Sequence, residues 1–482
     1  MADASAVMLS FPTDKPASSP QEYDQHMTTY LKQLDKLPSS AWKITDKQNP
    51  LELLDPAVNS IPYLICLLEL VKGVGKDREK AEQWLSQAAI FLASFDRVQV
   101  RYLGEQWREV WETALSISNK LGVLDVSPFS TALLRLDPTA GTFTTLHLQF
   151  LRLCMEQGTP SQALPILDKN IYAYPQASSK NVPAELRSEE HGLSNTFITP
   201  KSGFTEKIQP EYVLEYYLLG AHAYIAVRNY RRARLFLEHV VLHPSLSHGV
   251  SAFQAEAYKK WILIGLLTEG KPFPYIKTAD SAVIKSIKAL SKAYETLADD
   301  FEKRDSRKFQ ADMDVGMQVW QEDGNMGLVM EAGQALLRYR VADLQKTYAA
   351  LPVSRVATHL ELSPADTLDT LQHMIRQSSL NASLGTGATP GEAVLRFHFT
   401  NSTSSNSDSD LEAQTKRIEE LIAAVRDADR RLQLTKEHIE ISKRNKRAGP
   451  DAELAEQMDL SWDAPGSGPM VVDDDAEEDI MA

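Results

Sequence analysis

The sequence contains little cysteine and no long apolar run. Its two cysteines, Cys66 and Cys154, both lie in apolar stretches. Two cysteines cannot build a disulfide framework, so we expect buried thiols in a reducing compartment. The longest apolar stretch, 61–71, contains Pro62 and Glu69 and is far shorter than the roughly 20 residues that span a bilayer. The N-terminus also lacks the basic start and apolar run of a signal peptide, which together predicts a soluble intracellular protein.

The sequence also lacks an excess of positive charge. It has 51 basic and 65 acidic side chains, which give a formal net charge of −14, and 43% of its residues are apolar. Residues 448–482 contain eleven acidic side chains and no Lys or Arg, so the rest of the chain is close to neutral. Nucleic-acid binders and proteins of anionic membranes need a basic surface, so the charge of this sequence argues against both classes. At about 150 residues per domain, the length suggests about three structural units.

Catalytic and metal-binding motifs are scarce. His239 and His243 have the spacing of the two ligands in H-E-x-x-H, but Val240 occupies the position of the glutamate. The Gly-rich turn before Lys76 resembles a phosphate-binding loop, but Leu70 stands where its first glycine belongs. No serine or cysteine lies in a recognisable nucleophile motif. We therefore expect a protein that is not an enzyme and that has no catalytic residue, no metal site and no cofactor.

Helical periodicity dominates the first 335 residues and occurs in pairs of segments separated by short polar turns. In the clearest pair, Tyr224 is followed after nine residues by Ala233 and after four more by Leu237. This spacing approximates the tetratricopeptide pattern, in which a small residue lets the second helix pack closely on the first. Since one helical hairpin cannot bury its own apolar stripe, stacked neighbours must cover it. The paired segments are 61–71 with 78–95, 146–155 with 161–167, and 212–227 with 230–242, and the segments 253–267 and 284–297 are further layers.

A polar segment interrupts these repeats. Residues 176–210 lack helical periodicity, and we expect them to form a long surface loop. The loop lies between N-terminal repeats at 60–205 and a second set at 206–335, and we expect a variable arm at 1–59 before them. The predicted fold is mainly α, with a right-handed stack of tetratricopeptide-like helix pairs as its body.

Residues 336–400 have the pattern of a winged-helix module. An apolar stripe steps by three or four residues until Pro352, and a short helix is expected at 354–360. Two strands, at 381–384 and 393–399, then flank a Gly-rich turn with the alternation that is typical of half-buried strands. The stripe consists of Leu337, Val341, Leu344, Tyr348 and Leu351.

The third helix of this module begins with an acidic turn and carries a formal charge of −1. Ser363 fits its N-cap, Pro364 its first helical position, and Asp366 completes a capping box. Because DNA readout needs Lys, Arg, Asn or Gln at the base edges, nucleic-acid binding is not expected. We expect instead that an edge strand of the wing pairs with the sheet of a neighbouring protein, and that Arg396 in the second strand takes part in this contact.

After a Ser/Thr/Asn-rich linker at 401–410, apolar residues recur at a strict interval of seven, which predicts a helix at 411–444. Leu421 and Ala428 occupy the accompanying positions. A period of seven over four heptads is typical of coiled coils and helix bundles, and it requires a partner surface. The residues at the interval of seven are Leu411, Ile418, Val425, Leu432 and Ile439.

A basic cluster and an acidic tail follow, over 445–482. The cluster is either a nuclear import signal or a set of charges that is favourable at a helix C-terminus. The tail is expected to be disordered, because its composition is acidic and poor in aromatic residues. The basic residues are Lys443, Arg444, Lys446 and Arg447.

Several stretches of the sequence resemble a known family. Helical repeats that run into a winged helix are the layout of the PCI-domain family, and residues 344–362 are similar to that family's entry into its winged helix. Within the family, the chain most closely resembles the third subunits of the constitutive photomorphogenesis 9 signalosome. The resemblance covers residues 210–400 strongly and the N-terminal third weakly. The stretches that carry it are Tyr216–Gly220, Asn229–Ala233, Glu256–Lys260 and Asn325–Val329.

This resemblance implies a non-catalytic scaffold. Such subunits join six winged-helix proteins and two metalloprotease-fold proteins into a complex that removes the ubiquitin-like modifier NEDD8 from cullins, and the isopeptidase zinc belongs to another subunit. The resemblance also implies an open ring of winged helices, a bundle of C-terminal helices, and a location in both nucleus and cytoplasm. Cullin-RING ligases would be indirect partners, and neither nucleic acid nor membrane would be bound.

Three other interpretations are open at this point. A subunit of the proteasome lid or of translation initiation factor 3 has the same architecture. A monomeric helical-repeat adaptor that binds peptides predicts a polar terminal helix, which the apolar stripe of 411–439 contradicts. An RNA-binding winged-helix protein predicts a basic body, whereas the body of this chain is nearly neutral.

Overall fold

The computed structural model of this chain contains two compact units, one within residues 1–399 and one within residues 400–482. It describes residues 2–11, 19–42, 50–75, 77–123, 125–175, 187–189, 191, 193–244, 249–274, 279–377, 379–386, 393–398 and 407–433.

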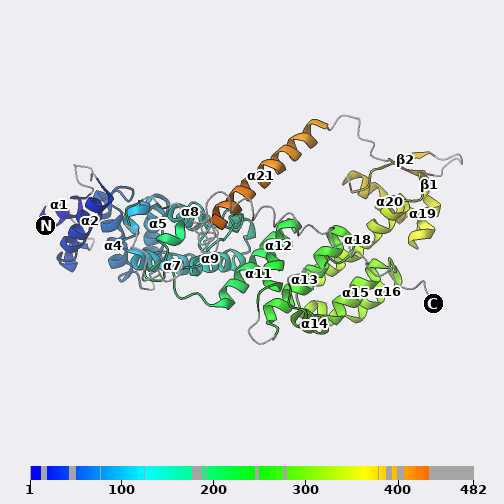
Figure 1. Ribbon diagram of the computed structural model, residues 1–482, viewed down its shortest axis with the longest axis horizontal. Coiled ribbons are helices and arrows are strands. Elements are labelled where there is room, and N and C mark those ends of the chain that lie inside the picture. Colours follow the sequence, from blue (N-terminus) through cyan, green and yellow to red (C-terminus); the bar gives the residue numbers. More distant parts are fainter. Residues whose placement is uncertain are drawn as a thin grey trace, which may run out of the picture. The chain divides into compact units, whose positions relative to one another are not determined.

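The first unit is mainly α-helical, and consecutive helices pack against one another along the chain (Figure 1). Because each helix contacts mainly its neighbours in sequence, the arrangement is a helical-repeat solenoid, which confirms the predicted fold class. Its N-terminal part consists of α1 (Ala2–Met8), α2 (Pro20–Leu34), the 3-10 turn η1 (Ser39–Trp42), α3 (Pro50–Leu53), α4 (Ser60–Val71), α5 (Arg78–Ser94), α6 (Arg97–Val100), α7 (Gly104–Leu121), α8 (Ser127–Leu136), α9 (Thr145–Glu156), η2 (Pro160–Ala163) and α10 (Leu164–Leu167).

The N-terminal segment that the sequence predicts to be an arm, 1–59, folds onto the first repeats in its described residues. Tyr30 is buried, and its hydroxyl donates a hydrogen bond to the carbonyl oxygen of Met8 at 2.7 Å. The side-chain amide of Asn59 donates to the carbonyl oxygen of Phe11 at 2.8 Å. These hydrogen bonds join parts of the segment to each other, whereas Met8, Tyr30 and Leu34 are buried in the same hydrophobic core as the first repeats.

Three helices that the sequence analysis misses, α6, α7 and α8, lie between the first two predicted pairs. Helix α7 has the 3/4 spacing of an amphipathic helix, since Trp107, Trp111 and Ala114 are buried, and Gly122 ends it in the left-handed region with φ 68°. The predicted helix at 161–167 is instead one 3-10 turn followed by one α-helical turn. Pro165 explains this break, because it has no N–H to donate within a longer helix.

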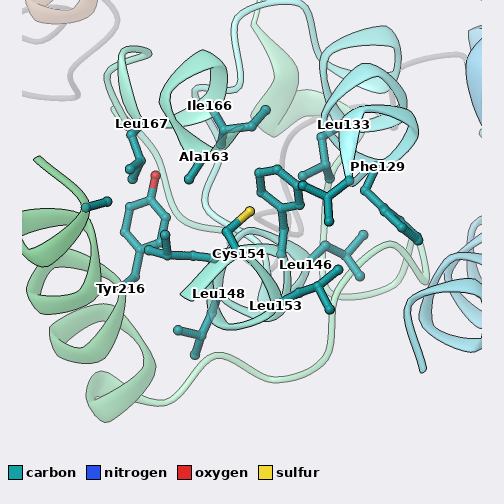
Figure 2. Packing of buried hydrophobic residues seen from close by; sticks show 14 of the residues in the cluster. Phe129, Leu133, Leu146, Leu148, Leu153, Cys154, Ala163, Ile166, Leu167 and Tyr216 are labelled. Atoms are coloured by element: carbon teal, nitrogen blue, oxygen red, sulfur yellow. The ribbon is translucent and has the colours of Figure 1, made fainter. Parts of the chain in front are cut away.

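Figure 2 shows the apolar packing where α8, α9 and α10 meet α11 (Pro210–Ala226). Cys154 lies inside this cluster, near Leu146 and Leu153 of its own helix. Both cysteines are buried and free, as the sequence predicts. Burial raises the pKa of the Cys66 and Cys154 thiols to about 12, so both thiols are protonated and unreactive at neutral pH.

Residues 193–205, which we call the strap, run across the first repeats and include the 3-10 turn η3 (Ser194–Thr196). Phe204 is fully buried, and its ring centroid lies 5.7 Å from that of Trp107. The hydroxyl oxygen of Thr205 accepts a hydrogen bond from the amide of Thr145 at 3.1 Å. The prediction that residues 176–210 form a surface loop is therefore wrong for the strap. Its few apolar residues are buried or half-buried between helices, although they have no helical spacing.

Helices α11 and α12 (Tyr230–Val241) form the predicted tetratricopeptide-like hairpin. Ala233 is fully buried, and a Cβ atom at Gly220 would lie 2.6 Å from ring atoms of Phe236. Small residues on both helices therefore permit their close approach. Tyr224 connects the hairpin to the preceding repeat, because its hydroxyl donates to a carboxylate oxygen of Asp168 at 2.7 Å.

The remaining helices continue the stack, with one difference from the prediction. The segment 284–297 was predicted as one helix, but Ser291 separates two helices and is itself buried. Asn325 immediately precedes the last of these helices. These helices are α13 (Ala252–Glu269), α14 (Ser281–Leu290), α15 (Lys292–Glu302), α16 (Ser306–Val315), α17 (Met317–Glu322) and α18 (Met326–Leu344).

The winged-helix module has its own hydrophobic core, separate from that of the solenoid. The two cores share helix α18, so the predicted boundary at residue 336 falls inside a helix. Tyr348 and Leu351 do not belong to that helix, because it ends at Leu344. The other elements of the module are β1 (Ala350–Pro352), α19 (Val353–Leu360), α20 (Pro364–Arg376), β2 (Ala382–Thr386) and β3 (Ala393–Phe397).

The described part of the second unit is a single helix, α21 (Ser407–Gln433). It begins inside the predicted linker, 401–410, and overlaps the predicted helix at 411–444.

We expect Gly104→Ala to lower the free energy of unfolding by about 1–3 kcal/mol, the usual cost of overpacking. A Cβ atom at Gly104 would lie 2.1 Å from the carbonyl oxygen of Ser202 in the strap, so the strap or α7 must move. Gly327→Ala is the matched control, because Gly327 also lies in the first turn of a helix and has no atom within 4 Å of its Cβ position. Urea unfolding measures both variants, and equal midpoints would contradict the position of the strap.

Candidate assembly surfaces

The winged-helix module contains a three-stranded antiparallel sheet in the order β1-β3-β2. Arg396 lies in the central strand, where it pairs with Ala350 on one side and with Ser383 on the other. The predicted two-stranded wing with Arg396 at an edge is therefore wrong. Strand β1 gives little sequence signal, because it has three residues and the last is Pro352.

The two edges of this sheet, β1 and β2, offer different numbers of free backbone groups. Pro352 in β1 has no N–H to donate. Beside β2, the amide of His398 donates to the carbonyl oxygen of Asn381 at 2.9 Å. Because hydrogen-bonded and non-hydrogen-bonded pairs alternate in antiparallel ladders, Leu384 and Thr386 direct their N–H and C=O groups away from β3. Strand β2 is therefore the edge that is better suited to pair with another strand.

Ser363 caps helix α20, the third helix of the module, as the sequence predicts, but Asp366 does not complete the predicted capping box, because its carboxylate contacts the hydroxyl of Ser363 and not the backbone amide. The hydroxyl oxygen of Ser363 accepts a hydrogen bond from the amide of Asp366 at 3.1 Å, and the same hydroxyl donates to the Asp366 carboxylate at 2.6 Å. Leu371 and Met374 are buried in the core of the module. The opposite face of the helix carries an acidic first turn, which nucleic acid would repel.

The apolar stripe of α21 is exposed along its described length. The side chains at the interval of seven have exposed fractions between 55% and 58%, and Leu421 is 51% exposed. Ile422, which is 45% exposed, lies beside Leu421 and widens the stripe to three apolar positions in one heptad. A stripe of this width is more typical of bundle helices than of the narrow contact of a two-stranded coiled coil. Ile439 and the basic residues Lys443, Arg444, Lys446 and Arg447 lie outside the described residues.

Two of the stretches that carry the family resemblance meet in a polar network between α13 and the start of α18. Lys260 donates to the side-chain oxygen of Asn325 at 2.9 Å and to Glu256 at 3.0 Å. The side-chain amide of Asn325 donates to the hydroxyl oxygen of Tyr294 at 2.8 Å, and this hydroxyl donates to Asp323 at 2.8 Å. Asn325 is completely buried. The network therefore satisfies polar groups that would be costly to bury alone.

The charges of this network favour the ionised form of Glu256. A close approach of His222 and the neighbouring Lys260 lower the pKa of the Glu256 carboxyl to about 2, against an ordinary value of 4.5. A depressed pKa means that the folded chain favours the carboxylate, so its contribution to stability is complete above about pH 4.5 and is lost as the pH falls toward 2. The polar side chains of the two stretches that carry the family resemblance therefore stabilise the fold where α13 meets the start of α18.

His239, one of the two histidines considered as metal ligands, packs against an aromatic ring in the helical hairpin. The ring of His239 packs against that of Tyr217 at a centroid distance of 4.7 Å and a tilt of 30°, and burial lowers the pKa of His239, which favours the neutral ring. Within the part of the chain that the structure describes, no three His, Cys, Asp or Glu side chains are grouped to hold a metal ion. Of the helices described, none has both the length and the apolar character that crossing a membrane requires.

Comparisons with known proteins match most of the chain. The sequence profile of the family "COP9 signalosome complex subunit 3, N-terminal helical repeats" matches residues 21–284. The chain is 30% identical to COP9 signalosome complex subunit 3 of Emericella nidulans over 477 residues, which cover 94% of this chain and 93% of that protein. The proteins of the same name from Neurospora crassa and Drosophila melanogaster are 26% identical over 436 residues and 24% identical over 365 residues. These alignments cover 87% and 74% of this chain, and 87% and 78% of the respective relatives.

We expect Asn325→Ala to lower the free energy of unfolding by about 2–3 kcal/mol, because Lys260 and Tyr294 each lose one hydrogen-bond partner at a buried site. Asn229→Ala is the matched control. Asn229 also precedes a helix, but it is exposed and its side chain only accepts a hydrogen bond from the amide of Arg232, so its loss should cost about 1 kcal/mol. Chemical unfolding of both variants tests this, and an equal effect would contradict a stabilising role of the network.

Proposed function

The chain belongs to the family of COP9 signalosome complex subunit 3, and from this premise we propose that it is a non-catalytic scaffold of a signalosome that removes NEDD8 from cullins. The observation that carries the proposal is the exposed apolar stripe of α21. Its regular interval of seven, from Leu411 to Leu432, needs a partner surface for burial. A scaffold subunit obtains that surface from the other subunits of its complex.

The energetics favour burial of this stripe in a helix bundle. Its six large apolar side chains are each about half exposed, so covering each one contributes roughly 1 kcal/mol. The sum is enough to influence assembly without fixing it alone, since association also costs translational and side-chain entropy. A second contact is therefore needed.

The winged-helix sheet supplies this second contact in our proposal. A strand of a neighbouring winged-helix subunit would pair with β2, where the backbone groups of Leu384 and Thr386 point away from β3. Main-chain hydrogen bonds give such strand addition its affinity. The assignment replaces the earlier expectation for Arg396, whose backbone is already paired on both sides.

A purely structural role agrees with the state of the possible nucleophiles. Both cysteines are buried and have pKa values raised to about 12, so neither forms a thiolate at neutral pH. In this proposal the isopeptidase zinc belongs to a metalloprotease-fold subunit, and this chain contacts cullin-RING ligases only through the complex. We propose a location in nucleus and cytoplasm, with Lys443, Arg444, Lys446 and Arg447 as the import signal.

We expect deletion of residues 411–447 to leave the solenoid and winged helix folded while abolishing co-purification with the other signalosome subunits. The deletion removes the stripe, and the first unit keeps both of its hydrophobic cores. Native mass spectrometry of tagged full-length and truncated chains measures the assembly, and circular dichroism checks the fold. Replacement of Leu411, Ile418, Val425 and Leu432 by serine is the matched control for loss of length, and should also abolish assembly. An intact complex with either variant would overturn the proposal.

We expect Thr386→Pro to weaken binding of the neighbouring winged-helix subunit about 5- to 30-fold, the equivalent of about 1–2 kcal/mol. The substitution removes an N–H that points away from β3, and the preceding Gly385 tolerates the restriction that proline imposes. Thr386→Ala retains the N–H and is the control. Biolayer interferometry against the neighbour found by co-purification measures the affinities. Equal affinities for the two variants would exclude β2 as the paired edge.

A further inference from the structure

The chain passes from the solenoid to the winged helix inside one helix, α18 (Figure 1). Val329 and Leu336 belong to the hydrophobic core of the solenoid, whereas Val341 and Leu344 belong to that of the winged helix. Arg340 lies between these two sets and is only 9% exposed. A buried guanidinium is costly unless it has well-placed hydrogen-bond acceptors, so the boundary between the cores depends on how Arg340 is satisfied.

Arg340 has one acceptor on each side of this boundary. One terminal nitrogen donates to the hydroxyl oxygen of Ser306, the first residue of α16 in the solenoid. The other donates to the backbone carbonyl oxygen of His359, in the last turn of α19 in the winged helix. The planar guanidinium thus holds an oxygen atom of each module in a fixed relative direction.

The end of α19 makes this contact more favourable than an ordinary hydrogen bond. Helix α19 ends at Leu360, and the residue that follows, Glu361, is left-handed with φ 62°. The last carbonyl groups of a helix have no intrahelical donor, and they form the negative end of the helix dipole. The positive charge of Arg340 therefore meets a partial negative charge, although both of its acceptors are neutral groups.

Among the described residues, no hydrogen bond or ion pair joins α20 to the solenoid. There, an open groove of about 1110 Å³ separates the two modules, with Tyr230 and Leu337 on the solenoid side and Asp369 and His373 on α20. Relative motion is the default expectation for modules that share little interface. The orientation of the winged helix is consequently set on one side, where α18, α16 and α19 meet.

We propose that Arg340 is the positioning residue that fixes the orientation of the winged-helix module relative to the solenoid. It thereby sets the direction in which β2 is presented to a neighbouring subunit. Only this second statement rests on the proposed function, because the orientation itself is a property of the isolated chain.

Distances between two spin labels on the full-length chain test this proposal. We would place the labels at Leu290→Cys in the solenoid and Arg376→Cys in α20, both of which are exposed positions. The native cysteines are buried and protonated, so they do not compete for the label. We expect Arg340→Met to broaden the distance distribution measured by double electron–electron resonance about twofold, because the winged helix then pivots about α18.

Arg307→Ala is the matched control. Arg307 connects the same two helices through an ion pair with Glu361 at 2.7 Å, but its side chain is 81% exposed, and such surface pairs contribute little. The control should keep the distribution of the wild type. A label pair within the solenoid, Ile90→Cys with Leu290→Cys, should be unchanged in every variant. A distribution for Arg340→Met as narrow as that of the wild type would overturn the proposal.

Hydrogen exchange in α20 and β3 shows whether the winged helix stays folded in Arg340→Met. If it unfolds, Arg340→Lys provides the decisive distances, because one ammonium group cannot hold two separate acceptors in the planar geometry of a guanidinium. A broadened distribution then supports the proposal, and one as narrow as that of the wild type overturns it. Co-purification of the same variants is a separate readout. Broadened distances with normal assembly would support Arg340 as the positioning residue and contradict the proposed role of β2.

Discussion

The structure depends on one constraint: a pair of helices exposes more apolar surface than it can cover by itself. Close packing between layers removes this surface from water, and it requires small residues where two backbones approach. Gly220 against Phe236 and Gly104 against Ser202 are two examples of this requirement, because a methyl group would collide at either glycine. Each layer is stable only in contact with the next. In α21 the same constraint applies to a stripe that is exposed along its described length.

The helices with a strong 3.6-residue period were predictable from the sequence. Segments 61–71, 78–95 and 253–267 coincide closely with α4, α5 and α13, because their apolar spacing, Pro and Gly positions all indicate the same element. The breaks were not predictable. Ser291 carries no strong helix-breaking signal, and the strap has too few apolar residues for a period, although Phe204 among them is fully buried. Their positions follow from contacts with helices distant in the sequence, which local patterns do not contain.

The features of the candidate surfaces likewise fall into those that the sequence could predict and those that it could not. The α21 stripe was predictable because a heptad repeat is a property of one segment. Strand β1 was not predictable, because its three residues, which end in Pro352, acquire strand geometry only by pairing with β3. With β1 present, β3 and its Arg396 lie in the centre of the sheet and not at its edge. Arg340 had no signal at all: its acceptors lie 34 and 19 residues away. The stretch that contains Lys260 was recognised as typical of a family, but its contact with Asn325, 65 residues later, required the fold.

In the proposed function, the exposure of the α21 stripe would also distinguish a subunit without partners from a subunit inside the complex. A chain synthesised in excess of its partners would expose this apolar stripe. Exposed apolar surface of this kind is bound by chaperones and leads to degradation by proteases. Assembly into the complex would bury the stripe, so that chaperones and proteases no longer bind it. If α21 contributes to assembly as proposed, its stripe would also let the cell match the abundance of this subunit to that of its partners, without a dedicated sensor.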